Sequence, residues 1–203
     1  MARSRTGGRR SAAARPSVPE SAPSAVGDAP IPSLASATLP RVWQGVGYRP
    51  LAEPGPARRL FDFAAVPWPA CEALALAWGA SHDDRLVGAI VGERARSSTV
   101  RAADSGVALG TSMFLHGPVV VTDRDPIEVA AQLVTAALDH ARALGVETLF
   151  ARPLALDRLW VRFGFIPTPE SALPPSLAGR PGSGLYAWRG GSALWTFRDI
   201  PRD

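Results

Sequence analysis

Two titratable residues lie in or at the end of apolar segments, where a proton-transfer group could be held in place. His116 lies inside the apolar run Gly110–Thr122, and Glu93 ends the apolar run Arg85–Glu93. A histidine of ordinary pKa can accept a proton from an amine at neutral pH, and a carboxylate can do so through a water molecule. Each residue also has a plain structural interpretation, as a strand histidine without a chemical role and as a solvated strand end. The sequence leaves both interpretations open.

Other reactive residue types are scarce in this chain of 203 residues. The chain has one cysteine, Cys71, which excludes a disulfide framework and a multi-cysteine zinc site. It has three histidines, which provide few ligands for a metal cluster. We therefore expect no metal. Cys71 lies in a segment with helical spacing, which favours a buried structural thiol. His140 falls in the middle of a longer helical pattern beside Asp139 and Arg142, and we expect it at the surface.

The hydrophobic pattern predicts the elements that must position His116 and Glu93. The Gly117-Pro118 pair predicts a bulge or bend inside its strand. In chain order, the pattern predicts a strand at Val42–Leu51, helices at Ala57–Ala65 and Pro67–Trp78, strands at Arg85–Glu93 and Gly110–Thr122, a helix at Asp125–Leu144, a strand at Val146–Ala151, a helix at Leu154–Phe163, a strand that begins at Phe165, and a hairpin of Leu185–Trp188 with Ala193–Phe197.

The segment Asp125–Leu144 has the clearest helical pattern, with apolar residues at spacings of three and four. Asp125 is the predicted N-cap, Pro126 suits the first helical position, and Glu128 completes an arrangement like a capping box. Gly145 predicts the C-terminal end.

The first 40 residues have a composition that predicts disorder. They consist almost entirely of Ala, Ser, Pro, Arg and Gly, and the first aromatic residue of the chain is Trp43. Such a segment cannot bury enough apolar surface to offset the entropy that ordering would cost. We expect a disordered tail over residues 1–40 and one folded domain over residues 41–203.

The positive charge of the chain is concentrated in this tail. The isoelectric point is about 10.4, but residues 1–40 carry five arginines against two acids, and the remainder is nearly neutral. The folded part therefore lacks the excess of positive charge that is typical of a nucleic-acid-binding surface. No apolar run is long enough to span a membrane, and none follows the N-terminal arginines as in a secretory signal, so we expect a soluble, cytoplasmic protein. The absence of Lys and Asn indicates a GC-rich, bacterial genome.

Two segments together resemble the GNAT superfamily of N-acetyltransferases. They are LHGPVVVTDRDPIEVAAQLVTAALDHARALGVETLFA, from Leu115 to Ala151, and LWVRFGFIP, from Leu159 to Pro167. The helix in the first resembles the coenzyme-A-binding helix of that family, and the second is similar to its LYEKLGF motif. The resemblance covers about Tyr48 to Phe197. It implies one α/β (α+β) domain, with a mixed central sheet flanked by helices.

The resemblance implies an acyltransferase that moves an acetyl or other acyl group from acyl-coenzyme A to a small-molecule or peptide amine. A splayed central strand would pair with the pantetheine arm, and the following loop and helix N-terminus would face the pyrophosphate. The catalytic candidates are His116 and Glu93 as bases and Tyr186 as the acid for the leaving thiolate. The implied cofactor contacts are Val119, Val120, Val121, Arg124, Ile127, Glu128, Val129 and Ala130.

The sequence departs from the family pattern at two points. The family loop reads (Gln/Arg)-x-x-Gly-x-(Gly/Ala), but here Ile127 or Glu128 replaces its central glycine, and Pro126 removes an N–H donor. Trp160 stands where the motif has its tyrosine. Two other functions therefore stay open: a non-catalytic binding or scaffolding protein of the same fold, and an enzyme with another acyl donor such as aminoacyl-tRNA. Exposed sheet edges would permit a dimer, which the sequence does not test.

Overall fold

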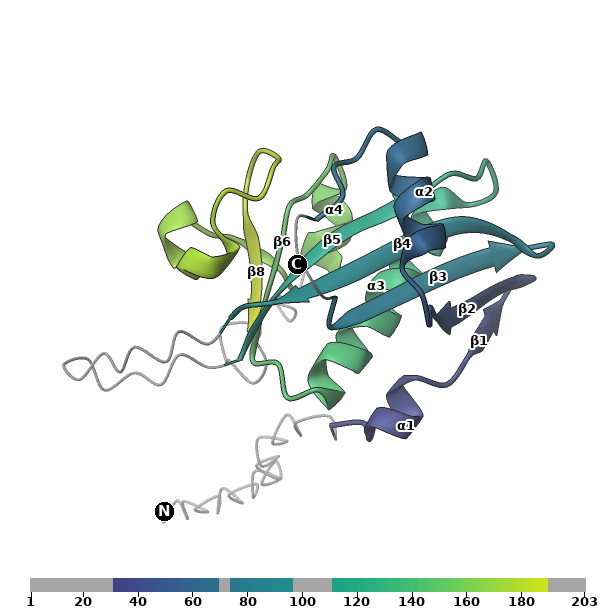
Figure 1. Ribbon diagram of the computed structural model, residues 1–203, viewed down its shortest axis with the longest axis horizontal. Coiled ribbons are helices and arrows are strands. Elements are labelled where there is room, and N and C mark those ends of the chain that lie inside the picture. Colours follow the sequence, from purple (N-terminus) through teal and green to yellow (C-terminus); the bar gives the residue numbers. More distant parts are fainter. Residues whose placement is uncertain (1–30, 70–73, 97–110, 190–203) are drawn as a thin grey trace, which may run out of the picture.

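The computed structural model describes residues 31–69, 74–96 and 111–189, which form one sheet with helices on both faces (Figure 1). The strand order is β1-β2-β3-β4-β5-β6-β8-β7, antiparallel throughout except between β5 and β6. The expectation of a mixed sheet flanked by helices in one α/β domain is confirmed. The elements are α1 (Leu34–Ala37), β1 (Arg41–Trp43), β2 (Val46–Pro50), α2 (Gly55–Phe63), β3 (Leu76–His82), β4 (Arg85–Arg94), β5 (Ser112–Val120), α3 (Pro126–Ala143), β6 (Thr148–Ala151), α4 (Asp157–Arg162), β7 (Ile166–Pro167), the short 3-10 helices η1 (Glu170–Ala172) and η2 (Pro175–Leu177), and β8 (Tyr186–Arg189).

The segment Val42–Leu51, which was expected to be one strand, contains a hairpin instead. Gln44 and Gly45 form its turn with φ angles of 47° and 80°, and β1 pairs with β2 on either side of it. Positive φ at both central residues matches the twist of paired strands. Gln44 is not one of the residues that commonly signal such a turn, so the sequence pattern did not reveal it.

The predicted helix Pro67–Trp78 is wrong. Pro67–Pro69 is not helical, and β3 takes the end of the segment from Leu76 onward. Within β3, Leu76 and Trp78 are buried on the face that α3 covers and Ala77 packs on the opposite face, as strand alternation requires, and β2 and β4 pair with both edges of the strand. Cys71 lies outside the described residues.

The bulge predicted in the strand that carries His116 is present. The register between β4 and β5 shifts between Ala89 and Val91, so that Gly117 and Pro118 together lie opposite one residue of β4. Gly117 has a φ of 93°, and a Cβ there would lie 3.0 Å from the carbonyl oxygen of Ala89. Only glycine fits this position, because its conformation is strained for any other residue and the space is already filled.

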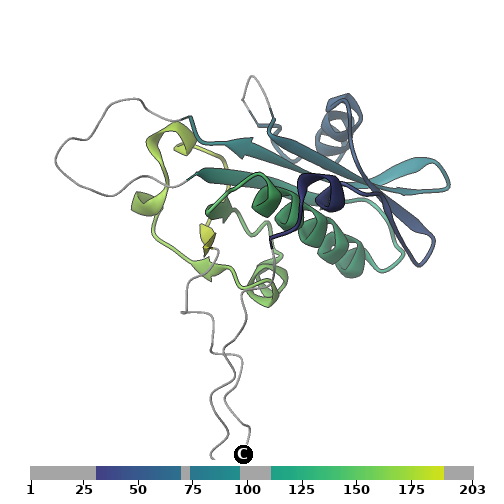
Figure 2. The same ribbon diagram turned by 90° about the horizontal axis from the view of Figure 1, so that it is seen from below.

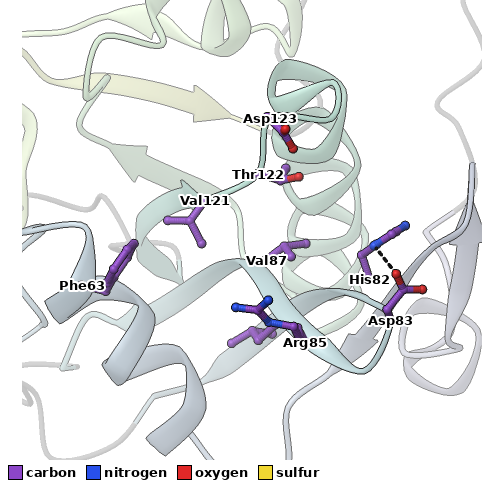
Figure 3. Close-up of a pocket in the computed structure, with 9 residues that line it drawn as sticks. Phe63, His82, Asp83, Arg85, Val87, Val121, Thr122 and Asp123 are labelled. Carbon is purple, nitrogen blue, oxygen red and sulfur yellow. Dashed lines mark ion pairs between the residues drawn. The ribbon is translucent and has the colours of Figure 1, made fainter.

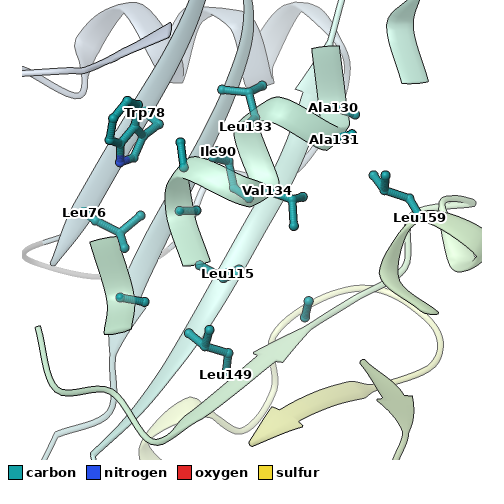
Figure 4. Packing of buried hydrophobic residues seen from close by; sticks show 14 of the residues in the cluster. Leu76, Trp78, Ile90, Leu115, Ala130, Ala131, Leu133, Val134, Leu149 and Leu159 are labelled. Carbon is teal, nitrogen blue, oxygen red and sulfur yellow. The ribbon is translucent and has the colours of Figure 1, made fainter. Parts of the chain in front are cut away.

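The main core lies between the sheet and α3. Leu133 and Val134 of this helix are fully buried against Trp78, Ile90 and Leu115 of the three central strands (Figure 4). The helix begins and ends close to its predicted bounds.

Two details of α3 differ from expectation. Asp125 occupies the N-cap position in a left-handed conformation, and its side chain makes no cap hydrogen bond. The carboxylate of Glu128 accepts a hydrogen bond from Gln132 Nε2 at 2.8 Å, so no capping box forms. His140 is half-buried rather than at the surface, and its Nδ1 accepts a hydrogen bond from Trp78 Nε1 at 3.2 Å.

The opposite face of the sheet is covered by α2 and by the segment 168–184. Figure 2 shows α2 on one side of the sheet and α1 and α3 on the other. Phe61 of α2 packs against the central strands, and Leu173 and Leu177 pack against Phe114 of β5 and Phe150 of β6. The side chains of His116, Glu93 and Arg180, described below, lie on this face.

The described chain begins before the predicted domain boundary at residue 41. The helix α1 lies within the segment expected to be disordered, and its Ala37 is buried. Residues 1–30 and the second strand of the predicted C-terminal hairpin, Ala193–Phe197, lie outside the described residues. Among the described helices, none combines the length and the apolar character that a membrane span requires.

Candidate active site

The parallel strands β5 and β6 stay paired over four residues only. The pairing joins Ser112–Leu115 to Thr148–Ala151, and β5 then continues to Val120 paired with β4 alone. The N–H of Val121 donates to the carbonyl of Val87 at 2.8 Å. Strand alternation therefore directs the N–H and C=O of Val120 away from β4, toward the side on which β6 has ended. An extended ligand that carries amide groups can pair with the backbone here.

His116 is the first residue of β5 beyond this pairing, and it contacts Glu93 of β4. Its Nε2 lies 3.1 Å from Glu93 Oε2, and the two residues are 8% and 5% exposed. Arg180, from the segment 168–184, donates from Nε to the same carboxylate oxygen at 2.8 Å and from Nη2 to the other oxygen. The sheet thus brings together two residues that the sequence analysis selected separately, and a distant loop adds an arginine that it missed.

The protonation states of this cluster follow from burial and from Arg180. Burial by itself would raise the pKa of Glu93, but hydrogen bonds from Arg180 and His116 outweigh it and hold that pKa below its usual value. Burial lowers the pKa of His116 to about 4, although the hydrogen bond to Glu93 acts in the opposite direction. Burial therefore keeps the imidazole neutral at pH 7, and the positive charge of Arg180 acts in the same direction.

Glu93 also selects the tautomer of His116. An ionised carboxylate only accepts hydrogen bonds, so Nε2 carries the proton and Nδ1 carries the lone pair. Nδ1 has no hydrogen-bond partner in the described part of the chain, and the ring packs against Phe114 with 4.8 Å between the centroids. A small cavity opens beside this ring. The arrangement provides a neutral, oriented imidazole that can accept a proton.

A second buried arginine, Arg152, holds the segment 168–184 over the sheet. It follows β6 directly and forms a two-pronged ion pair with Glu170, with 3.0 Å from Nη2 to Oε2. Its guanidinium also donates to the carbonyls of Gly184 at 2.8 Å and Arg180 at 3.1 Å. Arg152 therefore fixes the loop from which Arg180 reaches Glu93. Its place immediately after an apolar strand was the one signal in the sequence that could have identified it.

The N-terminus of α3 offers few groups to a phosphate. Pro126 has no N–H, and the N–H groups of Glu128 and Val129 both donate to the carbonyl of Asp125. The Glu128 side chain is half-buried at this end, within 3.9 Å of Arg162. Of the predicted cofactor residues, Val119, Val129 and Ala130 are buried, Val120 and Val121 are half-buried, and Arg124 and Ile127 are exposed. Ile127 is the first residue of this turn whose N–H could meet an anion.

Arg124 is engaged with the turn between β3 and β4. Its Nη1 lies 2.8 Å from His82 Nε2, and His82 Nδ1 lies 3.2 Å from Asp83 Oδ2. Since a guanidinium only donates, His82 accepts at Nε2 and presents its Nδ1–H to Asp83. An open pocket of about 510 Å³ lies beside this turn, bounded by α2 and by residues 121–123 (Figure 3). Its charged lining is of mixed sign, since it includes Arg85 as well as Asp83 and Asp123.

Tyr186 lies on the other face of the sheet from His116. It pairs with Ala151 across β8 and β6 and packs with the α3-side core. Its hydroxyl donates to Asp157 Oδ1 at 2.9 Å, and this hydrogen bond raises the pKa of Tyr186. The structure does not bring this residue to His116 and Glu93, and its role as an acid stays a prediction. Among the described residues, no group of three or more His, Cys, Asp or Glu side chains is placed to hold a metal ion.

Comparisons with solved structures find the same fold in acetyltransferases. N-acetylglutamate synthase from Neisseria gonorrhoeae, complexed with coenzyme A and N-acetyl-glutamate, matches with a TM-score of 0.52 and 16% identity over 75% of this chain and 36% of that one. NAA60 of Arabidopsis thaliana, complexed with acetyl-CoA, matches with a TM-score of 0.51 and 15% identity over 71% and 98% of the two chains. No family model and no curated protein sequence matches. The GNAT fold predicted from the two sequence segments is confirmed.

Proposed function

We propose that this chain transfers an acyl group from an acyl-coenzyme A to the amine of a small molecule or peptide. The fold supports this general kind of reaction, since acetyltransferases share it. The observation that carries the proposal is the neutral His116, oriented by Glu93 at the point where β5 and β6 separate. That point is where a ligand lying along the unpaired backbone of β5 would meet a base.

The backbone of β5 fits the pantetheine arm of coenzyme A. Its carbonyl and N–H groups beyond Leu115, above all those of Val120, lack a β6 partner and match the amides of an extended chain. Pro118 lies in this stretch without an N–H, so the carbonyl groups carry more of the pairing there. Coenzyme A, when bound, supplies the acyl group as a reactive thioester.

His116 would remove the proton from the acceptor. The amine nitrogen becomes acidic as it bonds to the acyl carbon, and Nδ1 of the neutral imidazole can then accept its proton. Glu93 holds the Nε2–H throughout and stabilises the imidazolium that forms. The low pKa of His116 keeps the base unprotonated at pH 7, so the rate per unprotonated amine should persist well below pH 6.5.

The N-terminus of α3 favours a second candidate, a non-catalytic binding protein of the same fold. Asp123, Asp125 and Glu128 place negative charge where a pyrophosphate would lie, and Arg124 already donates to His82. Anions bind a helix N-terminus through free N–H groups and the helix dipole, and acidic side chains at this end weaken both contributions. The two candidates differ in whether coenzyme A binds.

Isothermal titration calorimetry of the full chain with acetyl-CoA, and with desulfo-coenzyme A for comparison, separates them. Micromolar binding would support the acyltransferase. If no heat of binding is measured up to millimolar acetyl-CoA, the non-catalytic binding protein is the function that the result supports. Acetyl transfer to amines would then be measured for His116→Gln, which keeps a donor for Glu93 but has no basic nitrogen. We expect a loss of at least a hundredfold in kcat, against less than threefold for the control His140→Gln on the other face. Equal rates would contradict the role of His116.

A further inference from the structure

We infer that this site also hydrolyses acyl-coenzyme A, with a water molecule in the small cavity beside His116 as the nucleophile. The inference rests on the proposed function in one respect, because it takes the acyl-coenzyme A of that proposal as the donor. It differs in the acceptor, since the acyl group passes to water and not to an amine. The size of the cavity and the charge of its lining both favour water.

The size of the cavity limits what can reach His116. Its enclosed part has room for about one water-sized group. The walls are formed by Val66 and Pro67, which follow α2, by Pro181 of the segment 168–184, and by residues of β5 and of the chain after β6. A water molecule fits this space as a whole, whereas an amine acceptor must keep the rest of its structure outside.

The free nitrogen of His116 is accessible. Nε2 faces Glu93, and Nδ1 has no hydrogen-bond partner in the described part of the chain. Among the described residues, the side-chain nitrogens that are both inaccessible and unpartnered are Arg152 Nε and Trp160 Nε1, so Nδ1 keeps accessible surface. Because His116 lines the cavity, a water molecule there can donate a hydrogen bond to Nδ1. Gly117 lines the same cavity, and a glycine can do so only with its backbone.

The lining also favours a neutral nucleophile over a cation. Of the described residues that line the cavity, Arg152 is the one with a full charge at pH 7, and none is a carboxylate. Glu93 contacts the other nitrogen of His116, and Glu170 pairs with Arg152 from outside the lining. An alkylammonium ion would therefore lose its hydration without gaining an anionic partner, which is costly. Water enters without that cost.

The reaction balances with acyl-coenzyme A and water as its two reactants. Water gives a proton to Nδ1 of His116 while its oxygen bonds to the acyl carbon. The carbon–sulfur bond breaks with its electron pair on sulfur, and the imidazolium returns the proton to the thiolate. The products are the free carboxylic acid and coenzyme A with its thiol. Glu93 stabilises the imidazolium between the two proton transfers.

Hydrolysis is measured on the full-length protein with acetyl-CoA and without any amine, as the release of thiol and of acetate. Reaction in water that carries a heavy oxygen isotope identifies the acceptor, since the label then enters the acetate. We expect thiol release to be at least about a hundredfold faster in the native protein than in His116→Gln, whereas the control His140→Gln, on the other face of the sheet, should stay within about threefold of the native rate.

Two further measurements assign the nucleophile to the cavity. In NMR spectra of the protein without ligand, cross-relaxation with a bound water molecule should appear at the imidazole protons of His116. Val66→Ile should lose most of the hydrolysis and keep its affinity for acetyl-CoA in calorimetry, because its additional methyl group takes up about the space of one water molecule. The matched control Val42→Ile, at an exposed position of the edge strand β1, should keep both.

The outcomes separate this inference from the proposed function. Acetylation of amines without hydrolysis above the spontaneous rate would overturn the inference and uphold the acyltransferase. Hydrolysis that depends on His116, without acetylation of any amine, would uphold the inference and overturn the acyltransferase. The absence of both reactions would overturn both. Equal hydrolysis by the native protein and His116→Gln, no bound water at His116, or undiminished hydrolysis in Val66→Ile would each overturn the inference alone.

Discussion

The neutral state of His116 is a prediction that can be tested without knowing any substrate. Burial lowers its pKa from an ordinary value of 6.5 to about 4. A histidine depressed in this way is neutral in the folded protein while the unfolded chain is already protonated. Its contribution to stability is therefore complete above pH 6.5 and is lost as the pH falls toward 4.

The size of this effect follows from the shift. Two and a half pKa units correspond to about 3 kcal/mol of unfolding free energy over the whole window, of which about 2 kcal/mol is lost between pH 7.5 and pH 5. Glu93 contributes little in that range, because its pKa lies below 4.5 and its own contribution is lost only at lower pH.

Urea unfolding at pH 7.5 and pH 5 provides the measurement, with His116→Gln as the variant that cannot titrate. We expect the native protein to lose about 2 kcal/mol more than the variant between these pH values. An NMR titration gives the pKa directly, since the chain has only three histidines to assign. An imidazole of His116 that titrates near 6.5, or equal losses in the two proteins, would refute the burial of a neutral imidazole at this position.

Three further substitutions test other parts of the site. Gly117→Ala should destabilise the fold by about 1–3 kcal/mol in thermal unfolding, because the φ of 93° is strained for alanine and Ala89 blocks its Cβ; an unchanged melting temperature would contradict the bulge. Arg180→Met should raise the pKa of His116, since the imidazolium would then balance the charge of Glu93. A pKa that stays near 4 in an NMR titration of this variant would contradict the effect assigned to Arg180. Glu128→Gln should tighten acetyl-CoA binding about two- to fivefold in calorimetry by removing a negative charge from the start of α3; weaker binding would contradict the electrostatic argument.

The sequence predicted the elements whose patterns are long and regular. The helix Asp125–Leu144 and the two apolar strands around His116 and Glu93 follow from periodicity, and the bulge follows from Gly117-Pro118. The failures have local causes. The β1–β2 turn uses Gln44, which carries no turn signal, and β3 has only a short apolar pattern whose type is decided by pairing on both edges.

The candidate site was predictable by residue but not by contact. His116 and Glu93 stand out as polar groups in apolar strands, yet their pairing depends on the register of β4 against β5. Arg180 and Arg152 were missed because one lies in a Pro- and Gly-rich loop and both are arginines in a chain that has 22 basic residues, all arginine. No local pattern separates a buried arginine from an exposed one when its acidic partner is 87 residues away.

The two ends of the implied cofactor site are not equally suited to coenzyme A, and this difference leads to a last prediction. The unpaired backbone of β5 fits a pantetheine arm, whereas the start of α3 offers a phosphate few N–H groups beside Glu128. Most of the binding free energy should then come from the pantetheine end.

We expect S-acetyl-pantetheine, which lacks the nucleotide, to serve as acyl donor with a kcat/KM within about tenfold of acetyl-CoA, since a weak helix-terminus contact contributes roughly 1 kcal/mol. Glu128→Gln should improve acetyl-CoA and leave S-acetyl-pantetheine unchanged. A loss of a thousandfold without the nucleotide would show that the start of α3 binds phosphate strongly in spite of its charge, and the argument from Glu128 would fail.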